Sequence, residues 1–195
     1  MNPEPEQRLS REQQLVLLKL AREVLHHAVT HGRQPASDFQ PYPAWMAKPA
    51  ACFVTLHHRD RLRGCIGSIE AHTSLGNDLI HNAYAAAFRD PRFPELSADE
   101  LPDLQISISI LTAPEPFPVA SERDLLQRLS PGRDGLILEE GFRRGLFLPA
   151  VWDQLPTPKE FLRQLKRKAG FAVDYWSDRI KVSRFFAYEF GEGDD

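Results

Sequence analysis

The stretch ACFVTLHHRDRLRGCIGSI, residues 51–69, contains two apolar runs separated by a short polar break. The first run covers residues 51–57 and the second covers residues 62–69, with His-Arg-Asp-Arg between them. Two strand-like runs joined by a short polar segment are typical of a β-hairpin. We therefore predict an antiparallel pair of strands in this part of the chain.

Two helices are expected on either side of this hairpin. Ser10 and Gln13 have the spacing of a capping box, and apolar residues then recur at helical spacing until Gly32, so a helix is predicted over residues 11–31. A second apolar stripe predicts a helix over residues 74–88. The prolines of the sequence Asp90-Pro-Arg-Phe-Pro end it, because proline cannot donate a backbone hydrogen bond.

The segment between the first helix and the hairpin is expected to be irregular. Residues 34–48 contain three prolines, and Tyr42 and Trp45 are the side chains expected to anchor this segment to the core. Beyond the second helix, residues 105–111 alternate strictly between apolar and polar side chains. This alternation predicts a half-buried strand in an antiparallel sheet.

The second half of the chain repeats the same kinds of element. We predict helices over residues 122–129 and 158–169, a hairpin of residues 135–141 and 145–149, and a single final strand over residues 179–190. Strands that come mostly as hairpins, with helices between them, indicate an α+β fold rather than a doubly wound parallel sheet. The expected architecture is a mostly antiparallel sheet flanked by helices.

Composition excludes several classes of protein. The 195 residues are 42% hydrophobic and 26% charged, as in globular proteins, and the two cysteines, Cys52 and Cys65, are too few for a disulfide scaffold. No apolar run reaches the roughly 20 residues that span a membrane, and the polar, acidic beginning argues against a secretory signal. We therefore expect a cytoplasmic protein. The net charge of −3 argues against nucleic acid as a partner.

The most unusual local sequence is Leu-Arg-Gly-Cys-Ile-Gly, residues 62–67, which we call the signature segment. Glycine is costly inside a strand and often marks close approach by a ligand or another backbone. Side-chain alternation predicts that Arg63 and Cys65 share a face, where the guanidinium would favour the reactive thiolate, beside an open position at Gly67. The alternative is a buried structural cysteine, with Gly67 making room for a neighbouring aromatic ring.

The signature segment resembles that of the AMMECR family, whose microbial members are known as AmmeMemoRadiSam system protein A. The resemblance continues in the same order through residues 87–93, 135–137, 144–149, 161–162 and 168–170, and so covers roughly residues 10–190. It implies one AMMECR-type domain of residues 10–190, with a larger lobe, a smaller lobe and a cleft between them near the signature segment. Residues 1–9 are then expected to be a flexible N-terminus and residues 191–195 an acidic tail.

The family resemblance also implies partners but no reaction. It implies a system that contains a Memo-like protein and a radical SAM protein. The chemistry of the family is unresolved, so the resemblance identifies no cofactor.

Charged residues outside the signature segment have two interpretations. Asp90 and Arg92 lie on a rigid, proline-bracketed turn that can present a charged pair to a ligand. Alternatively, this turn can act as a structural latch in which Asp90 accepts hydrogen bonds from backbone N–H groups.

Arg143 and Arg144 lie at a hairpin tip, where exposed charge is common. Together with Arg63 and Arg92 they can form an anion pocket, unless Glu139 and Glu140 neutralise them.

Metal and nucleic-acid sites have weaker support. His27 and His31 have a spacing that can bind zinc, but no third ligand is evident nearby, and no metal site is predicted. His57 or His58 can lie across the hairpin from Arg63, which leaves a Cys–His pair open. Basic residues at positions 159, 163 and 166–168 give one helix a charged side that is interpreted as solvated.

Two functions remain. In the first, the protein binds an anionic small molecule or a partner peptide in a cleft beside the signature segment. Arg63, Arg92 and Arg144 hold the anion, Gly64 and Gly67 allow close approach, and Asp90 belongs to the same site. Cys65 is then the nucleophile, with backbone N–H groups around Gly64 stabilising negative charge. In the second, the protein is a non-catalytic adaptor that docks a Memo-like or radical SAM partner.

Overall fold

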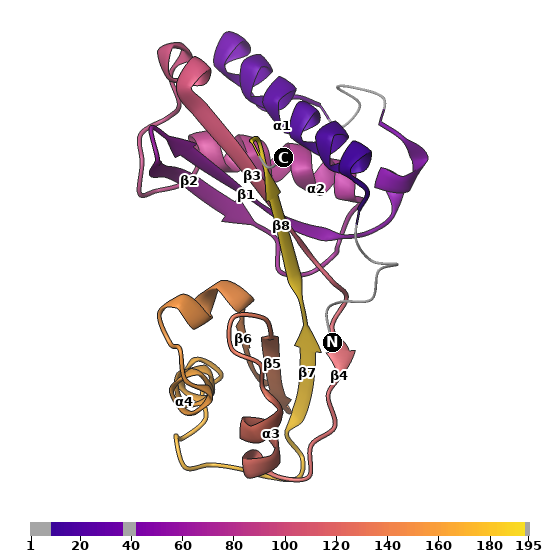
Figure 1. Cartoon of the computed structure of the whole chain (residues 1–195), viewed down its shortest axis with the longest axis vertical. Helices are drawn as coiled ribbons and strands as arrows, with labels where there is room; N and C mark the ends of the chain where they lie inside the picture. Colours follow the sequence, from indigo (N-terminus) through magenta and orange to yellow (C-terminus); the bar gives the residue numbers. More distant parts are fainter. Residues whose placement is uncertain (1–8, 37–41, 194–195) are drawn as a thin grey trace. The chain divides into compact units, whose positions relative to one another are not determined.

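The computed structural model describes residues 9–36 and 42–193, and the chain forms two compact units (Figure 1). The first unit consists of residues 1–111 and 188–195, and the second of residues 112–187. The predicted N-terminal segment therefore lies almost wholly outside the described residues, as do residues 37–41 of the proline-rich segment.

The first unit is built on a four-stranded antiparallel sheet with the order β2-β1-β3-β8. Its strands are β1 (Ala51–His58), β2 (Arg61–Gly67), β3 (Leu104–Leu111) and β8 (Ala187–Gly191). The predicted hairpin is confirmed as β1–β2. It turns through Arg59 and Asp60, both with positive φ (50° and 62°), as a two-residue hairpin loop of the primed type requires.

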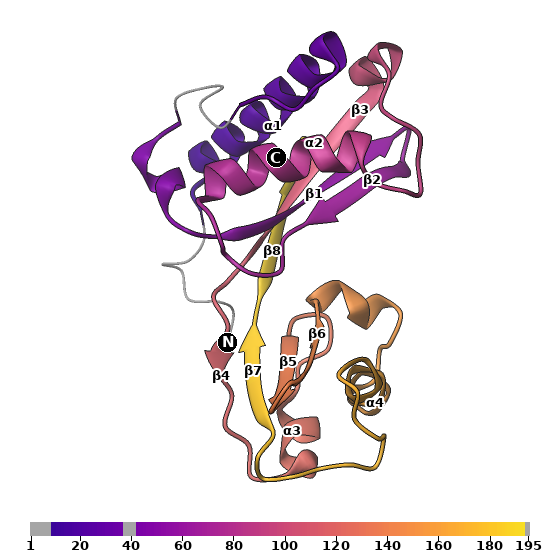
Figure 2. The same cartoon turned by 180° about the vertical axis from the view of Figure 1, so that it is seen from behind.

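Two helices cover one face of this sheet, α1 (Arg11–His31) and α2 (Leu75–Phe88), as both views show (Figures 1 and 2). Both helices are where the sequence predicts them, and the capping box of Ser10 and Gln13 is formed. The alternate residues of β3, Ile106, Ile108 and Ile110, are buried against the helices. The opposite face of β1 and β3 carries half-buried polar side chains, so this sheet face is not part of the core.

The proline-rich segment contains one short 3₁₀ turn, η2 (Ala44–Ala47). Tyr42 and Trp45 pack against the core of the first unit, as predicted. The Tyr42 ring lies against Gly76, where a Cβ atom would come within 2.5 Å of it, and its hydroxyl bonds to Ser74 and Asn77. A second 3₁₀ turn, η3 (Ala98–Asp103), leads into β3.

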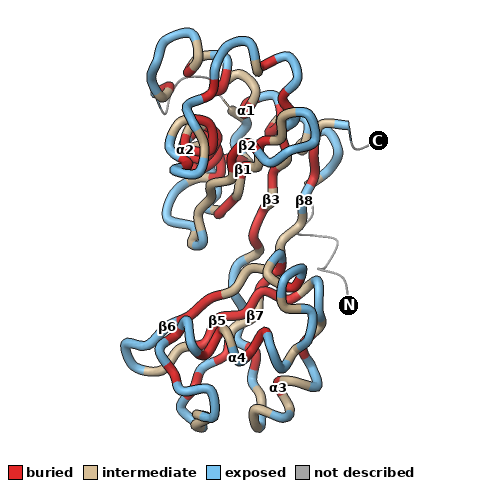
Figure 3. Tube along the Cα trace, turned by 90° about the vertical axis from the view of Figure 1, so that its left-hand side faces the viewer, coloured by how far each residue is buried: buried red, intermediate tan, exposed pale blue. Residues whose placement is uncertain are grey.

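The second unit contains another antiparallel sheet, with the order β4-β7-β5-β6. Its elements are β4 (Glu115–Pro116), α3 (Glu122–Arg128), β5 (Gly135–Glu140), β6 (Arg143–Phe147), η4 (Pro149–Asp153), α4 (Pro158–Lys168) and β7 (Lys181–Phe185). Buried residues gather between this sheet and the two helices (Figure 3). At their centre the rings of Trp152 and Phe161 stack with centroids 3.8 Å apart.

One predicted element was wrong. Residues 179–190 form two strands, β7 and β8, that belong to different sheets. Between them Phe186 and Thr112 exchange hydrogen bonds: the Thr112 N–H donates to the Phe186 carbonyl, and the Phe186 N–H donates to Thr112 Oγ1. The backbone stays extended through the change of sheet, and no proline or glycine interrupts the apolar run, so nothing in the local sequence marks the boundary.

Contacts of Glu192 follow directly after the last strand. Gly191 is the last residue of β8. The Glu192 carboxylate pairs with the Arg22 guanidinium of α1 and accepts the Ile106 N–H at 2.9 Å. These contacts attach Glu192 to both α1 and β3.

The fold class is α+β, as predicted, with two separate antiparallel sheets flanked by helices instead of one. Among the described residues, no helix is long and apolar enough to cross a membrane.

Gly145→Ala is expected to destabilise the second unit. A Cβ atom at Gly145 would lie 2.6 Å from the Cβ atom and 2.8 Å from the backbone nitrogen of Ala169, so the end of α4 must move away from β6. Overpacking of this kind costs about 2 kcal/mol, measurable as a lower midpoint of denaturant unfolding. Gly132→Asn is the control, because Gly132 has open space and a φ of 76° that Asn tolerates. Equal stability of the two variants would contradict the close packing of β6 on α4.

Candidate functional site

A β-bulge at Arg63 changes the predicted geometry of the signature segment. Leu62 pairs with His57 and Gly64 pairs with Leu56, so Arg63 is an extra residue of β2 with no partner position in β1. The bulge interrupts the alternation of side chains. The prediction that Arg63 and Cys65 share a face was wrong for this reason: Arg63 is buried against the segment after α2, whereas Cys65 pairs with Thr55 on the open face.

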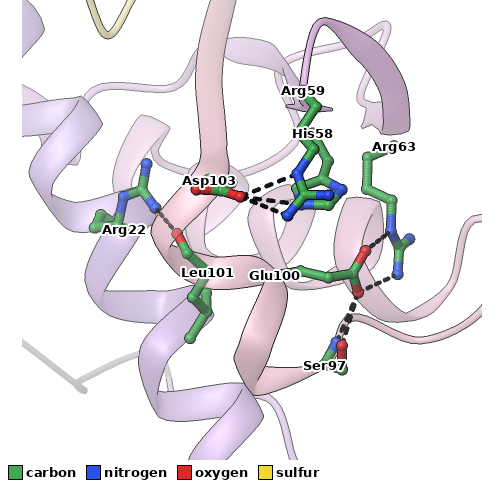
Figure 4. Close-up of polar contacts among 8 residues, drawn as sticks. All are labelled: Arg22, His58, Arg59, Arg63, Ser97, Glu100, Leu101 and Asp103. Atoms are coloured by element: carbon green, nitrogen blue, oxygen red, sulfur yellow. Dashed lines mark hydrogen bonds and ion pairs between the residues drawn. The ribbon is translucent and has the colours of Figure 1, made fainter.

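The Arg63 guanidinium is held by Glu100 of η3 (Figure 4). Its Nε and Nη2 atoms donate to the two carboxylate oxygens at 2.6 and 3.0 Å, and Nη2 also donates to the Glu95 carbonyl. This arginine holds the pKa of Glu100 at about 2, well below its ordinary value. The charge of Arg63 is therefore neutralised inside the protein by Glu100. The expected interaction between the Arg63 guanidinium and the Cys65 thiol is not formed.

Asp90 and Arg92 clamp the outer edge of β2. The buried Asp90 carboxylate accepts the Cys65 N–H at 2.9 Å, and Arg92 Nη2 donates to the Cys65 carbonyl at 3.4 Å. β2 is an edge strand, and these two side chains satisfy backbone groups that an additional strand would otherwise satisfy. Because the Cys65 N–H is occupied by a carboxylate, it is not a free donor for developing negative charge.

The turn that carries this clamp is itself tightly bonded. Asp90 accepts hydrogen bonds from the Arg92 backbone N–H at 3.1 Å, from Nε at 2.9 Å and from Nη2 at 2.7 Å. The Arg92 guanidinium and these N–H groups hold the pKa of Asp90 far below its ordinary value, and Asp90 raises the pKa of Arg92. This geometry is that of the structural latch, although the Arg92 side chain remains 53% exposed.

The space beside each glycine of the signature segment is filled by other atoms of the protein. A Cβ atom at Gly64 would lie 2.0 Å from the Ala86 carbonyl oxygen of α2, so glycine allows α2 to approach the sheet. At Gly67 a Cβ atom would lie 2.2 Å from the Phe53 ring. The space that a ligand was expected to use at these positions is therefore filled by the protein itself. Gly67 accommodates an aromatic ring, as in the alternative interpretation.

Cys65 lies in a row of small polar side chains on the open face of the sheet. Thr55 is paired with Cys65 on one side and with Ser107 on the other, so the three residues lie side by side across β2, β1 and β3. The Thr55 hydroxyl donates to the Cys65 sulfur at 3.3 Å, and Cys65 is half-buried. Thr55 and Ser107 were not predicted as site residues. Their polar side chains alternate with the buried residues of their strands, which was the available signal.

A cavity of about 310 Å³ opens on the same sheet face, one row from Cys65. It is lined by His57, Gln105, Ile106, Ser107, Glu189, Gly191 and Glu192. Of the two histidines considered for a Cys–His pair, His57 belongs to this face. His58 instead lies 4.0 Å from Asp103. No hydrogen bond joins His57 to Cys65 within the described part of the chain.

The second cysteine is structural. Cys52 is fully buried, and burial raises the pKa of its thiol well above the ordinary value. Its backbone N–H donates to Asp78, and its carbonyl accepts from Asn82 and from the Ser68 N–H. These buried polar residues connect the start of β1 to α2. They leave Cys65 as the cysteine available for chemistry.

The remaining candidates lie elsewhere. Arg144 belongs to the second unit and pairs with Glu139 at 3.6 Å. The His27 and His31 rings stack 4.2 Å apart, and the residues that the structure describes hold no group of three or more potential metal ligands. In α4, Lys166 is fully buried against Glu122 at 2.7 Å, so the expectation of a wholly solvated basic side was wrong for this residue.

Comparison with known proteins identifies the family. The profile of the AMMECR1 family matches residues 18–190. The chain belongs to the AMMECR1 family. A protein of Thermofilum pendens is 38% identical over 95% of this chain and 92% of its own length, and protein MJ0810 of Methanocaldococcus jannaschii is 40% identical over 78% of each chain.

A solved structure supports both the fold and the family. The crystal structure of the uncharacterised protein PH0010 from Pyrococcus horikoshii superposes with a TM-score of 0.75 and 32% sequence identity, covering 95% of this chain and 94% of that one. The AMMECR1 relatives confirm the family resemblance seen in the signature segment. Their names state no reaction.

Glu100→Gln is expected to destabilise the protein by about 2 kcal/mol at neutral pH, because it leaves the buried Arg63 without its anionic partner. Since the folded-state pKa of Glu100 is depressed from 4.5 to about 2, the ion pair stabilises the fold above about pH 4.5. That stabilisation is lost as the pH falls toward 2. The difference in unfolding free energy between wild type and variant is therefore expected to shrink over this range.

Asp103→Asn on the same turn is the matched control. Asp103 pairs with the exposed Arg59, so its loss is expected to cost less than about 1 kcal/mol (Figure 4). A Glu100→Gln cost that does not vary between about pH 5 and pH 2 would contradict the assigned pKa.

Proposed function

We propose that this AMMECR1-family protein is a component of a modification pathway and uses Cys65 as a nucleophile on the open face of the first sheet. The observation that carries the proposal is the hydrogen bond from Thr55 Oγ1 to Cys65 Sγ. A cavity lined by His57 and Ser107 lies on the same sheet face, although Cys65 is not among its lining residues. The Thr55 hydroxyl holds the Cys65 sulfur atom in place on this face. The thiolate is the form that attacks carbon.

The proposed substrate is a small molecule or a partner peptide that contains an activated acyl group. The Cys65 thiol first loses its proton to a base, for which His57 on the same face is the proposed acceptor. The sulfur lone pair then forms a bond to the acyl carbon, and the leaving group departs with the electrons of the bond that breaks. The product is a thioester at Cys65, from which the acyl group passes to an acceptor.

Fewer arginines are proposed to bind an anion beside Cys65 than the sequence indicates. Arg63 is neutralised by Glu100, so anion binding beside Cys65 is assigned to the exposed part of the Arg92 guanidinium. Arg144 belongs to the second unit and pairs with Glu139, so it is assigned no role at this site. The proposed partners are a Memo-like protein and a radical SAM protein, as the family resemblance implies.

Thr55→Val is expected to slow alkylation of Cys65 by iodoacetamide about fivefold at neutral pH, because the thiolate loses one hydrogen bond. Mass spectrometry of the folded wild type is expected to find one alkylated cysteine, at Cys65, since Cys52 is fully buried. Ser107→Ala is the matched control: Ser107 lies in the same row, and its loss removes no contact to the sulfur.

An activated aryl ester tests the acyl step. The wild type is expected to gain the mass of one acyl group, and Cys65→Ser to gain none. A Cys65 that reacts only after unfolding, or acylation that persists in Cys65→Ser, would rule out the proposed nucleophile.

The adaptor function has its own supporting observation. Leu62, the first residue of the signature segment, is 40% exposed, and Ile69, two residues beyond its end, is 44% exposed. Large apolar side chains on the surface often mark contact with another protein. In this second candidate function, the edge of the sheet docks a Memo-like or radical SAM partner and Cys65 takes no part in covalent chemistry.

Leu62→Asp and Ile69→Asp separate the two functions. If the protein is an adaptor, each variant is expected to weaken binding of the Memo-like protein encoded in the same genome by about tenfold in calorimetry, because a charge replaces an apolar contact. Leu15→Asp is the control, as Leu15 is an exposed leucine on α1, with 51% of its surface accessible. Unchanged binding in both variants excludes docking through the signature segment.

A further inference from the structure

The second unit contains a cavity that the proposed function does not use. It has a volume of about 550 Å³ and is lined by Glu140, Gly141, Phe142, Arg143, Tyr175 and Arg179. These residues come from the tip of the β5–β6 hairpin and from the segment between α4 and β7. A volume of this size is within the range of ligand-binding pockets.

Phe142 is the most exposed large apolar residue of the described chain. Its side chain is fully solvent-accessible, at 101%, whereas the other exposed large apolar residues reach at most 51%. Gly141 takes a φ of 61° as the first residue of the two-residue turn, and this places Phe142 at the tip. No contact within the protein requires an aromatic ring there. A partner that buries the ring would gain the hydrophobic free energy that folding leaves unused.

The charges that line this cavity sum to a positive value. The Glu140 carboxylate is fully engaged: Tyr175 Oη donates to it at 2.8 Å, Ser177 Oγ at 2.9 Å, and Arg179 lies 3.2 Å away. Tyr175 is the main cause of a lowered pKa at Glu140, which therefore stays ionised. Against this one carboxylate stand the two guanidinium groups of Arg143 and Arg179.

The two arginines have different surroundings. Arg143 lies 5.5 Å from the Phe171 ring centroid, which fixes its position without neutralising its charge. Arg179 is 81% exposed, so its guanidinium edges face solvent beyond the Glu140 contact. Both are accessible to carboxylates of a bound molecule.

The charge of the whole unit agrees with that of the cavity. Residues 112–187 contain 13 Lys and Arg against 10 Asp and Glu, although the complete chain carries a net charge of −3. The net charge is therefore positive in the second unit, which bears the exposed ring of Phe142, and negative in the rest of the chain. Complementary charge favours an acidic partner and speeds its encounter.

We propose that this cavity binds an acidic peptide segment of a partner protein, with an aromatic or large aliphatic side chain packed on Phe142 and carboxylates paired with Arg143 and Arg179. The combination of an exposed aromatic ring with flanking arginines is typical of residues that dominate binding at protein interfaces. This site is independent of Cys65, and its partner does not have to be the substrate of the proposed acyl transfer.

Fluorescence anisotropy with a short labelled peptide of Glu and Trp residues tests the proposal on the full chain. We expect saturable binding on the order of 10–100 µM at low salt, weakening as salt is added. Phe142→Ala and Arg143→Glu are each expected to weaken binding about tenfold. Both variants change exposed hairpin residues and are expected to unfold at the wild-type temperature.

Matched controls separate specific binding from general attraction. Arg163→Glu makes the same change of charge on the exposed side of α4, and Leu15→Ala removes an exposed apolar side chain from α1. Neither is expected to change binding. Cys65→Ser is also expected to bind normally, so that failure of the nucleophile and failure of this site give different results. Peptides with Ser in place of Trp, or Lys in place of Glu, are expected to bind much more weakly.

Several outcomes would overturn the proposal. One is the absence of saturable binding up to about 1 mM peptide. A second is an equal loss of affinity in Arg143→Glu and Arg163→Glu, which would indicate non-specific charge attraction. A third is Phe142-dependent binding to vesicles of anionic phospholipid or to a single-stranded oligonucleotide, without binding to the acidic peptide. That result would assign the site to a different class of partner.

Discussion

The Asp90 carboxylate holds the edge strand on which the signature segment lies. It accepts the Cys65 N–H and three hydrogen bonds from Arg92, while Arg92 reaches the Cys65 carbonyl. A buried carboxylate without such donors would be strongly unfavourable, so the turn and the strand stabilise each other. Because the outward-facing N–H and carbonyl groups of Cys65 are hydrogen-bonded in this way, β2 keeps a fixed register. Its side chains remain accessible on the open face of the sheet.

A similar division of roles applies to the charged and neutral groups around this strand. Arg63 and Arg92 are each paired with a carboxylate. The space beside Gly64 and beside Gly67 is filled by a neighbouring group of the protein. The charged residues of the region thus build the structure, and the half-buried thiol with its hydroxyl neighbour Thr55 remains on the surface. This is why the proposed chemistry rests on the open sheet face and not on an arginine pocket.

The two units also differ in the kind of surface they offer. The first unit has a cavity lined by His57, Ser107 and two glutamates, whereas the second has an exposed phenylalanine between arginines. The first surface lies on the open face of its sheet, and the second lies at the tip of the β5–β6 hairpin. The chain connects the units by extended backbone at Thr112 and Phe186, which exchange hydrogen bonds.

Local patterns in the sequence determined most of the secondary structure. The capping box at Ser10, the alternation through residues 105–111 and the polar break at residues 58–61 each depend on neighbours along the chain, and each prediction was confirmed. The family followed from the signature segment for the same reason, because it is a contiguous stretch. The α+β class followed from the succession of hairpins and helices.

Only the tertiary structure decided the contacts of the side chains. A bulge of one residue turned Arg63 away from Cys65, and no local pattern distinguishes a bulged strand from a regular one. Glu100 neutralises Arg63 from 37 residues away, and the division of residues 179–190 between two sheets depends on strands far along the chain. Such features depend on which distant segments pair, and sequence periodicity carries no information about that pairing.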